Sequence, residues 1–222
     1  MIVEADNISL SFDNKKILYG VYLKAEKGKI TGLLGRNGSG KTCLLRIIFG
    51  DLNSKYKNIR INSKHHKKNL FTSHTIAYLP QHKLLPKNLR LTKAFKIFDA
   101  DWATFTKIFE SFAIYKNSKT NKLSSGELRV VETYLVLNSG KAILLLDEPF
   151  SFIAPIYIEK FKTLIQEKKE EAVIIITDHF YRDILELSDA IYFLKNGYSK
   201  IIKSKKDLEN EGYLNINFEE RS

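Results

Sequence analysis

Cysteine, tryptophan and methionine are nearly absent from this sequence, with one residue of each among 222. The single cysteine, Cys43, excludes an internal disulfide framework and fits a reducing compartment. The longest aliphatic runs, Ala142–Leu146 and Ala172–Ile176, are far shorter than the roughly 20 residues of a membrane-spanning helix. The first residues show no basic segment followed by an apolar core, so no export signal is visible. We therefore expect a cytoplasmic protein.

Acidic residues are missing between residues 52 and 98, although this segment holds eleven lysines and arginines. Its charge therefore equals the +11 of the whole chain. The segment also holds four of the five histidines, namely His65, His66, His74 and His82. Because no cysteine or carboxylate stands near His65 and His66, we interpret this pair as solvated loop and not as a metal site. A lysine-rich solvated loop and a functional basic face both remain open for the segment.

Strand-like and helix-like segments alternate along the chain, which predicts a layered α/β sheet. With 44% apolar and 27% charged residues, the composition is that of a globular protein with one sizeable core. The predicted strands are Ile2–Leu10, Ile17–Leu23, Lys29–Leu34, Ile59–Ile61, Thr75–Leu79, Ala142–Leu146 and Ala172–Thr177, with a turn at 13–16 and a last hairpin at Asn196-Gly197. The predicted helices lie at 44–50, within the aromatic-rich stretch 91–137, and at Ile156–Lys168 and Tyr181–Leu187.

The segment Gly35-Arg-Asn-Gly-Ser-Gly-Lys-Thr42 matches the phosphate-binding pattern G-x-x-x-x-G-K-[ST]. It follows a predicted strand and opens a predicted helix, as the pattern requires. Glycines let backbone N–H groups curl around phosphates, and the helix N-terminus adds the positive end of its dipole. We expect Lys41 to reach the β- and γ-phosphates and the Thr42 hydroxyl to bind Mg²⁺. A chance glycine turn is the alternative, and the strand–loop–helix setting disfavours it.

A second motif, Asp147-Glu148, follows the apolar run Ala142–Leu146. Such a run is typical of a buried parallel strand, and ligands bind at the carboxyl ends of these strands. We predict that Asp147 holds Mg²⁺, directly or through water. Glu148 could polarise the attacking water, and general-base catalysis contributes about 10²–10⁴-fold. Two acids after a strand would on their own favour a helix N-cap, but together with the glycine loop they favour catalysis.

Further motifs occur in one order and resemble the ATP-binding cassette (ABC) family. The stretch Leu123-Ser-Ser-Gly-Glu127 looks like the family signature LSGGE, with Ser125 in place of one glycine. Tyr78-Leu-Pro-Gln81 resembles the Q-loop, whose glutamine approaches Mg²⁺ and the water. Ile174–His179 resembles the switch strand, whose histidine contacts the γ-phosphate. Phe12 stands where the family places an aromatic ring against adenine.

The resemblance covers about residues 2–203 and implies a P-loop NTPase core with a mixed sheet, an N-terminal antiparallel β subdomain and an inserted helical subdomain at about 91–137. The chain 1–222 would then be a single nucleotide-binding domain that binds ATP and Mg²⁺. The implied catalytic residues are Glu148, His179, Gln81 and Lys41, and the implied metal ligands are Thr42, Gln81 and Asp147. The implied nucleotide-binding residues are Phe12, Gly35, Asn37, Gly38, Ser39, Gly40, Lys41, Thr42, Cys43, Ser124, Ser125, Gly126 and Glu127.

The signature acts in trans in this family, so Ser124 and Gly126 would meet the γ-phosphate bound to a second cassette. That partner could form a homodimer or a heterodimer with this chain. Two departures bear on turnover: Ala154 replaces the aspartate that helps to join the two sites, and Ser125 adopts positive φ less cheaply than glycine. We predict slow hydrolysis with intact nucleotide-driven dimerisation. The Cys43 side chain is expected to pack and not to react.

A cassette without a membrane span must pass its motion to another protein. Asp147–Phe150, Pro155-Ile156, Thr177–His179 and Tyr213-Leu214 resemble the branch that holds lipopolysaccharide-export and branched-chain amino-acid transport ATPases. This favours an ATPase subunit on the inner face of the membrane that drives a separate integral permease. The basic segment 52–98 would then lie near anionic lipid, where each lysine or arginine contributes about 1 kcal/mol. Its predicted contacts are Lys64, Lys67 and Lys68.

A non-transport ABC ATPase that acts on nucleic acid or the ribosome is the alternative, because the basic segment could neutralise phosphates. Against it, 29 of the 36 basic residues are lysines, whereas base readout and minor-groove insertion depend on arginine. The chain also shows no sustained heptads, and known relatives of that type usually carry two cassettes or a long coiled coil. The sequence therefore disfavours nucleic acid as a partner and leaves the cargo and the direction of transport open.

Overall fold

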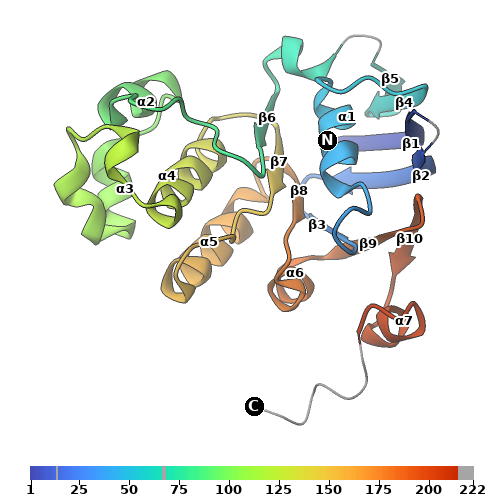
Figure 1. Ribbon diagram of the computed structural model, residues 1–222. Helices are drawn as coiled ribbons and strands as arrows, with labels where there is room; N and C mark the ends of the chain where they lie inside the picture. Colours follow the sequence, from blue (N-terminus) through green and yellow to red (C-terminus); the bar gives the residue numbers. More distant parts are fainter. Residues whose placement is uncertain (14, 67–68, 215–222) are drawn as a thin grey trace.

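The computed structural model describes residues 1–13, 15–66 and 69–214, which form two β-sheets and seven α-helices (Figure 1). The smaller sheet has the strand order β2-β1-β4-β5 and the larger sheet the order β10-β9-β3-β8-β7-β6. In the larger sheet, neighbouring strands lie far apart in the sequence. This arrangement brings the ends of several distant segments to one edge.

The smaller sheet is antiparallel and consists of β1 (Ile2–Phe12), β2 (Lys15–Glu26), β4 (Tyr56–Ile61) and β5 (Lys64–His65). Alternate residues of β1, including Val3 and Ala5, are fully buried, as expected for a strand with one face on the core. The predicted N-terminal hairpin and the antiparallel β subdomain are confirmed. The strands extend farther than predicted toward the turn, of which Asn14 lies outside the described residues.

The larger sheet is mixed, as predicted. Its strands β3 (Ile30–Leu34), β6 (Ile76–Leu79), β7 (Ile143–Asp147), β8 (Val173–Thr177) and β9 (Ala190–Lys195) run parallel, and β10 (Tyr198–Ile202) is antiparallel to β9. Every residue of β3, β7 and β8 is buried. These strands read as continuous apolar runs because both faces of a parallel sheet are covered.

Helix α1 (Lys41–Phe49) and the smaller sheet cover one face of the larger sheet, whereas α4 (Ser125–Leu137), α5 (Pro155–Lys168) and α6 (Tyr181–Leu187) cover the other (Figure 1). Side chains of β7 alternate between the two cores: Leu145 packs on the α1 side, and Leu144 and Leu146 pack on the α4–α5 side. The sheet is therefore the middle layer, with a hydrophobic core on each face.

The segment predicted to be helical at about 91–137 contains α2 (Leu91–Ile97), α3 (Trp102–Ile108), α4 and short 3₁₀ turns between them. Its aromatic residues form one cluster around Phe105, whose ring lies 4.8–5.3 Å from those of Phe95, Phe109, Phe112, Trp102 and Tyr134. These aromatic residues therefore belong to the hydrophobic core on this side of the sheet. The division of the chain into a core and an inserted subdomain stays a prediction.

The basic segment differs from its prediction in one respect, since Lys64–His65 form strand β5 against β4 instead of a loop. Two residues are too few to give a sequence pattern. The 3₁₀ turn at Leu70–Ser73 and helix α7 (Lys205–Asn210) were not predicted either, because one or two helical turns are too short to show a helical period. Lys67 and Lys68 lie outside the described residues. Within the described part of the chain, no helix has the length and apolarity to cross a membrane.

Candidate functional site

The glycine loop joins β3 to α1, as predicted, and its glycines are required by shape. A Cβ on Gly35 would lie 2.5 Å from the Ser39 hydroxyl and 2.6 Å from the Leu194 carbonyl oxygen. Gly40, at φ 102°, is the N-cap of α1 and would place a Cβ 2.8 Å from the Leu18 side chain. The loop therefore curls tightly at the N-terminus of a nine-residue helix, which is a geometry that binds phosphate groups.

Lys41 turns back into this loop. Its Nζ donates hydrogen bonds to the carbonyl oxygens of Gly35 at 2.7 Å and Arg36 at 3.4 Å, and only 6% of the residue is exposed. Burial lowers the pKa of the Lys41 ammonium, and the nearby Glu148 and Asp147 carboxylates oppose this shift. The ammonium is thus held inside the loop, where it can contact phosphate oxygens.

Asp147 lies at the end of β7 and is fully buried. Its Oδ2 accepts a hydrogen bond from the Tyr78 hydroxyl at 3.0 Å. Its Oδ1 is buried without a hydrogen bond of ordinary geometry in the described residues, although the Thr42 hydroxyl is near enough to lower the pKa of the carboxyl. Burial is the larger effect and raises this pKa. A buried carboxylate oxygen with spare capacity beside a hydroxyl fits a hard cation such as Mg²⁺.

Glu148 is the centre of a second group of contacts. Its Oε1 accepts a hydrogen bond from Gln81 Nε2 at 3.0 Å and lies 2.8 Å from His179 Nε2. Gln81 follows β6, Glu148 follows β7 and His179 follows β8, so the sheet order brings the three together. Glu148 has φ 57°, an uncommon backbone conformation for this residue type and one that recurs at functional sites.

These side chains border a cavity of about 420 Å³. It is lined by residues 37–43 of the glycine loop and α1, by Phe12 and Ile17 of the smaller sheet, and by Gln81, Glu148 and His179. Phe12 is about half exposed and lies at the cavity wall. Residues 37–42 of the glycine loop therefore meet Gln81, His179 and Phe12 around one space, whereas Gly35 and Asp147 are not among the described residues that line it. A cavity of this size is within the usual range for small-ligand sites.

Ser124, Ser125, Gly126 and Glu127 do not belong to the described residues that line this cavity. They begin α4 as a capping box, in which the Ser124 hydroxyl accepts from the Glu127 amide at 3.2 Å and Glu127 accepts from the Ser124 amide at 2.7 Å. A Cβ on Gly126 would collide with the Phe152 carbonyl oxygen. Ser124 and Ser125 are exposed. The segment is thus presented on the surface, away from the cavity of its own chain.

Arg129 was not predicted, yet it connects three of these segments. The residue is 5% exposed, and its guanidinium donates to the carbonyl oxygens of Pro80 at 2.7 Å, Glu148 at 2.9 Å and Asp147. It also lies 3.8 Å from Glu132, whose Oε1 accepts from the Leu84 and Leu85 amides at 2.8 and 2.9 Å. The sequence signal was an arginine and a glutamate three apart within the mostly apolar run Leu128–Leu137 of α4.

Comparison with known proteins identifies the family of this chain. Residues 18–151 match a family model described as ABC transporter, and this range is more than half of the chain. The chain belongs to the ABC transporter family. The prediction of an ABC ATPase with a P-loop α/β fold is thereby confirmed, as is the coarse role of ATP-binding, ATP-hydrolysing subunit of a transporter.

Individual ABC proteins resemble the chain over most of its length. The uncharacterised ABC transporter ATP-binding protein MJ1023 of Methanocaldococcus jannaschii is 29% identical, over 90% of this chain and 78% of that protein. The lipopolysaccharide export system ATP-binding protein LptB of Escherichia coli K12 is also 29% identical, over 87% of each chain. A solved ATP-binding subunit of an ABC transporter superposes with a TM-score of 0.80 at 20% identity, over 96% of this chain and 94% of the other, which supports the fold alone.

The departures from the ABC pattern have a visible structural setting. Ala154 is the N-cap of α5 and makes no side-chain capping hydrogen bond. Two residues earlier, Phe152 has φ 66° and is 81% exposed. The segment where the family resemblance expects an aspartate therefore offers an apolar ring and a methyl group to its surroundings.

Proposed function

We propose that this protein binds MgATP in the 420 Å³ cavity and hydrolyses it there. The observation that supports this most is the convergence of Gln81, Glu148 and His179 beside the glycine loop. Lys41 and the loop amides would hold the β- and γ-phosphates. Thr42 and Asp147 would hold Mg²⁺, which supplies charge neutralisation on the phosphates when bound.

Glu148 would act as the general base. In the present conformation its Oε1 is engaged by Gln81 and His179. Hydrolysis requires that this oxygen accept a proton from water as the water oxygen attacks the γ-phosphorus and the bond to the β-phosphate oxygen breaks. His179, 41% exposed at its side chain, would move its Nε2 from Glu148 to a γ-phosphate oxygen. ATP binding would thus release the Glu148 carboxylate and fix the position of the His179 side chain in the same step.

A second cassette would complete each site. Ser124–Glu127 lie on the surface and not in their own cavity, which fits a signature that meets ATP bound to a partner. We propose slow turnover because Ala154 lacks the carboxylate that the family resemblance expects at the joint between sites. A turnover of tens per second or more would contradict this part of the proposal.

The resulting motion would drive a separate integral permease, with the cassette on the cytoplasmic face of the membrane. LptB is named for lipopolysaccharide export and AraG of Mannheimia succiniciproducens for arabinose import, so the relatives leave the direction of transport open. The basic segment 52–98 would face anionic lipid, with Lys64, Lys67 and Lys68 as its contacts.

The test is a Glu148→Gln variant purified from native membranes in detergent with MgATP. We expect ATPase activity to fall by about 10²–10⁴-fold, because glutamine cannot accept the proton. We expect MgATP binding to persist, the protein to run as a dimer, and a multi-span membrane protein to co-purify with it. Glu170→Gln, which changes an exposed carboxylate, is the matched control and should behave as wild type.

Two results would contradict the proposal. If Glu148→Gln hydrolysed ATP as fast as wild type, Glu148 would not be the general base. Co-purification of ribosomes or nucleic acid, without a membrane protein, would indicate that the ATPase acts on that partner and not on a permease.

A further inference from the structure

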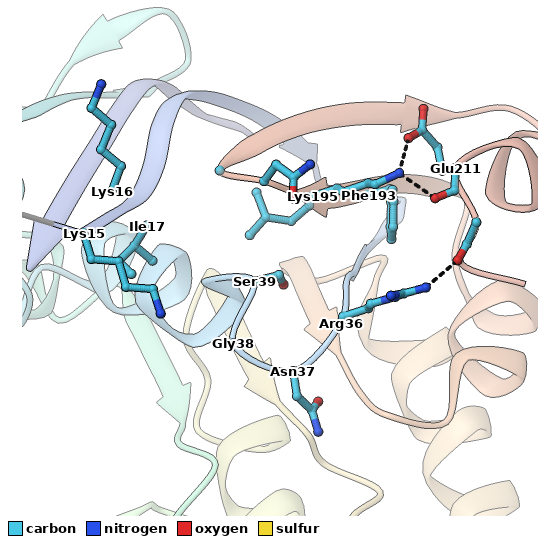
Figure 2. Close-up of a pocket in the computed structure, with 14 residues that line it drawn as sticks. Lys15, Lys16, Ile17, Arg36, Asn37, Gly38, Ser39, Phe193, Lys195 and Glu211 are labelled. Carbon is cyan, nitrogen blue, oxygen red and sulfur yellow. Dashed lines mark hydrogen bonds and ion pairs between the residues drawn. The ribbon is translucent and has the colours of Figure 1, made fainter.

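The P-loop residue Arg36 does not direct its guanidinium into the ATP cavity. Its Nη2 donates a hydrogen bond at 2.7 Å to the carbonyl oxygen of Gly212, just beyond helix α7 (Figure 2). Gly212 and Arg36 together line a second cavity of about 580 Å³, which shares Ile17 and residues 37–39 with the ATP cavity. One wall of the P-loop is therefore attached to the C-terminal part of the described chain, 176 residues away.

The turn that receives Arg36 is itself held in place. Lys195 Nζ donates to the Glu211 carbonyl oxygen at 2.7 Å and lies 3.3 Å from the Glu211 carboxylate (Figure 2). Lys200 Nζ also contacts this carboxylate, at 2.8 Å. Both lysines belong to the β9–β10 hairpin. Gly212 has φ 66°, a conformation that glycine adopts without a Cβ penalty. The turn is thus fixed on a hairpin of the central sheet before it meets the P-loop.

Tyr213 adds an apolar contact to this arrangement. Its ring centroid lies 5.0 Å from that of Phe193 in β9 and 6.1 Å from that of Tyr181, the first residue of α6. Its amide donates to the Leu208 carbonyl oxygen at 2.8 Å, and Leu208 is fully buried. Burial raises the pKa of the Tyr213 hydroxyl, and the Gly35 backbone opposes this shift. Tyr213 therefore packs on β9 and on the helix that begins two residues after His179, directly after the glycine whose carbonyl oxygen holds Arg36.

We propose that the turn Glu211–Tyr213 is a clamp that positions the P-loop for nucleotide and connects it to helix α6. Tyr213 is the positioning residue, since its ring packs on Phe193 and Tyr181 beside the Gly212 carbonyl that holds Arg36, and it does not line the ATP cavity. The inference rests on the proposed ATP site. Loosening the clamp frees Arg36 and the first half of the loop, which weakens nucleotide binding more than the chemical step.

The experiment compares Tyr213→Ala, Tyr213→Phe and the wild-type chain. Tyr213→Ala should weaken MgATP binding and raise KM about tenfold, which corresponds to about 1.4 kcal/mol. Its kcat should change less than about twofold, because the residue contributes to binding and not to the transition state alone. Tyr213→Phe keeps the ring and should recover most of the affinity. Tyr198→Ala removes an exposed tyrosine of the same hairpin and is the matched control.

Hydrogen exchange of the nucleotide-free protein gives a readout that does not depend on ATP. Exchange across residues 35–42 should accelerate in Tyr213→Ala and stay at the wild-type rate in Tyr198→Ala. Should Tyr213→Ala not fold, Glu211→Gln tests the same clamp, with a smaller acceleration that added salt reproduces in the wild type.

The outcomes separate the two proposals. Wild-type protein that fails to bind MgATP overturns the proposed function, whatever the exchange data show. Wild-type protein that binds MgATP, with unchanged KM and exchange in Tyr213→Ala, overturns the clamp. A fall in kcat at constant KM also overturns it, because the residue would then act on chemistry or on general stability.

Discussion

Replacing Arg129 by methionine should destabilise the protein strongly. The change keeps most of the apolar stem but removes the donors to the carbonyl oxygens of Pro80, Asp147 and Glu148. It also leaves Glu132, which is 2% exposed, without its cationic neighbour at 3.8 Å. An unsatisfied buried acceptor costs about 1–3 kcal/mol, and breaking a buried ion pair by removing one partner costs about 3–5 kcal/mol.

These contributions share one side chain and do not add in full, so we expect the free energy of unfolding to fall by about 4 kcal/mol. For a chain of 222 residues this lowers Tm by about 10 °C. Urea denaturation at constant pH measures the free energy, and calorimetry measures Tm. ATPase activity should fall as well, because the Q-loop and the end of β7 lose their common support.

Arg46→Met is the matched control. Arg46 pairs with Asp51 at 3.1 Å, but both side chains are about 40% exposed, so the loss should stay below about 1 kcal/mol. A loss below about 1 kcal/mol for Arg129→Met would refute the reasoning, since it would mean that water or a rearranged side chain replaces the guanidinium. Adding Glu132→Gln to Arg129→Met should recover part of the loss, because glutamine still accepts from the Leu84 and Leu85 amides without a buried charge.

Two further predictions concern charge. Burial raises the pKa of Asp178 from 3.8 to about 6, so the unfolded chain ionises first as pH rises, and the stability from this group is lost between about pH 4 and pH 6. Relative to wild type, Asp178→Asn should therefore gain about 3 kcal/mol between pH 4 and pH 7 in urea denaturation, and a difference independent of pH would contradict this. Glutamine at Lys64, Lys67 and Lys68 should weaken binding to anionic vesicles about 100-fold at physiological salt, at about 1 kcal/mol per lysine. Unchanged vesicle binding would show that these lysines do not contact lipid. The control variant replaces three exposed lysines of the helical segment by glutamine, namely Lys116, Lys119 and Lys122.

Most of the site could be predicted because its residues occur in short motifs with a local structural meaning. The run before Asp147 had to be a buried strand, and the glycines after Leu34 had to form a tight turn before a helix. Such patterns depend on neighbours within a few residues, which the sequence displays directly. The two-residue strand β5 and the six-residue helix α7 lack both a continuous apolar run and a full helical period, and they were missed.

By itself, the sequence determined the α/β class, the phosphate loop, the candidate base Glu148 and the buried character of the central strands. Only the tertiary structure decided which distant segments touch. The sheet order β3-β8-β7-β6 brings Gln81, Glu148 and His179 within hydrogen-bonding distance, and no spacing in the chain specifies that order. The same holds for Arg129, which bonds to Pro80 49 residues away, and for Arg36, which bonds to Gly212 176 residues away. Their roles arise from packing between layers, where the free energy comes from contacts that are nonlocal in sequence.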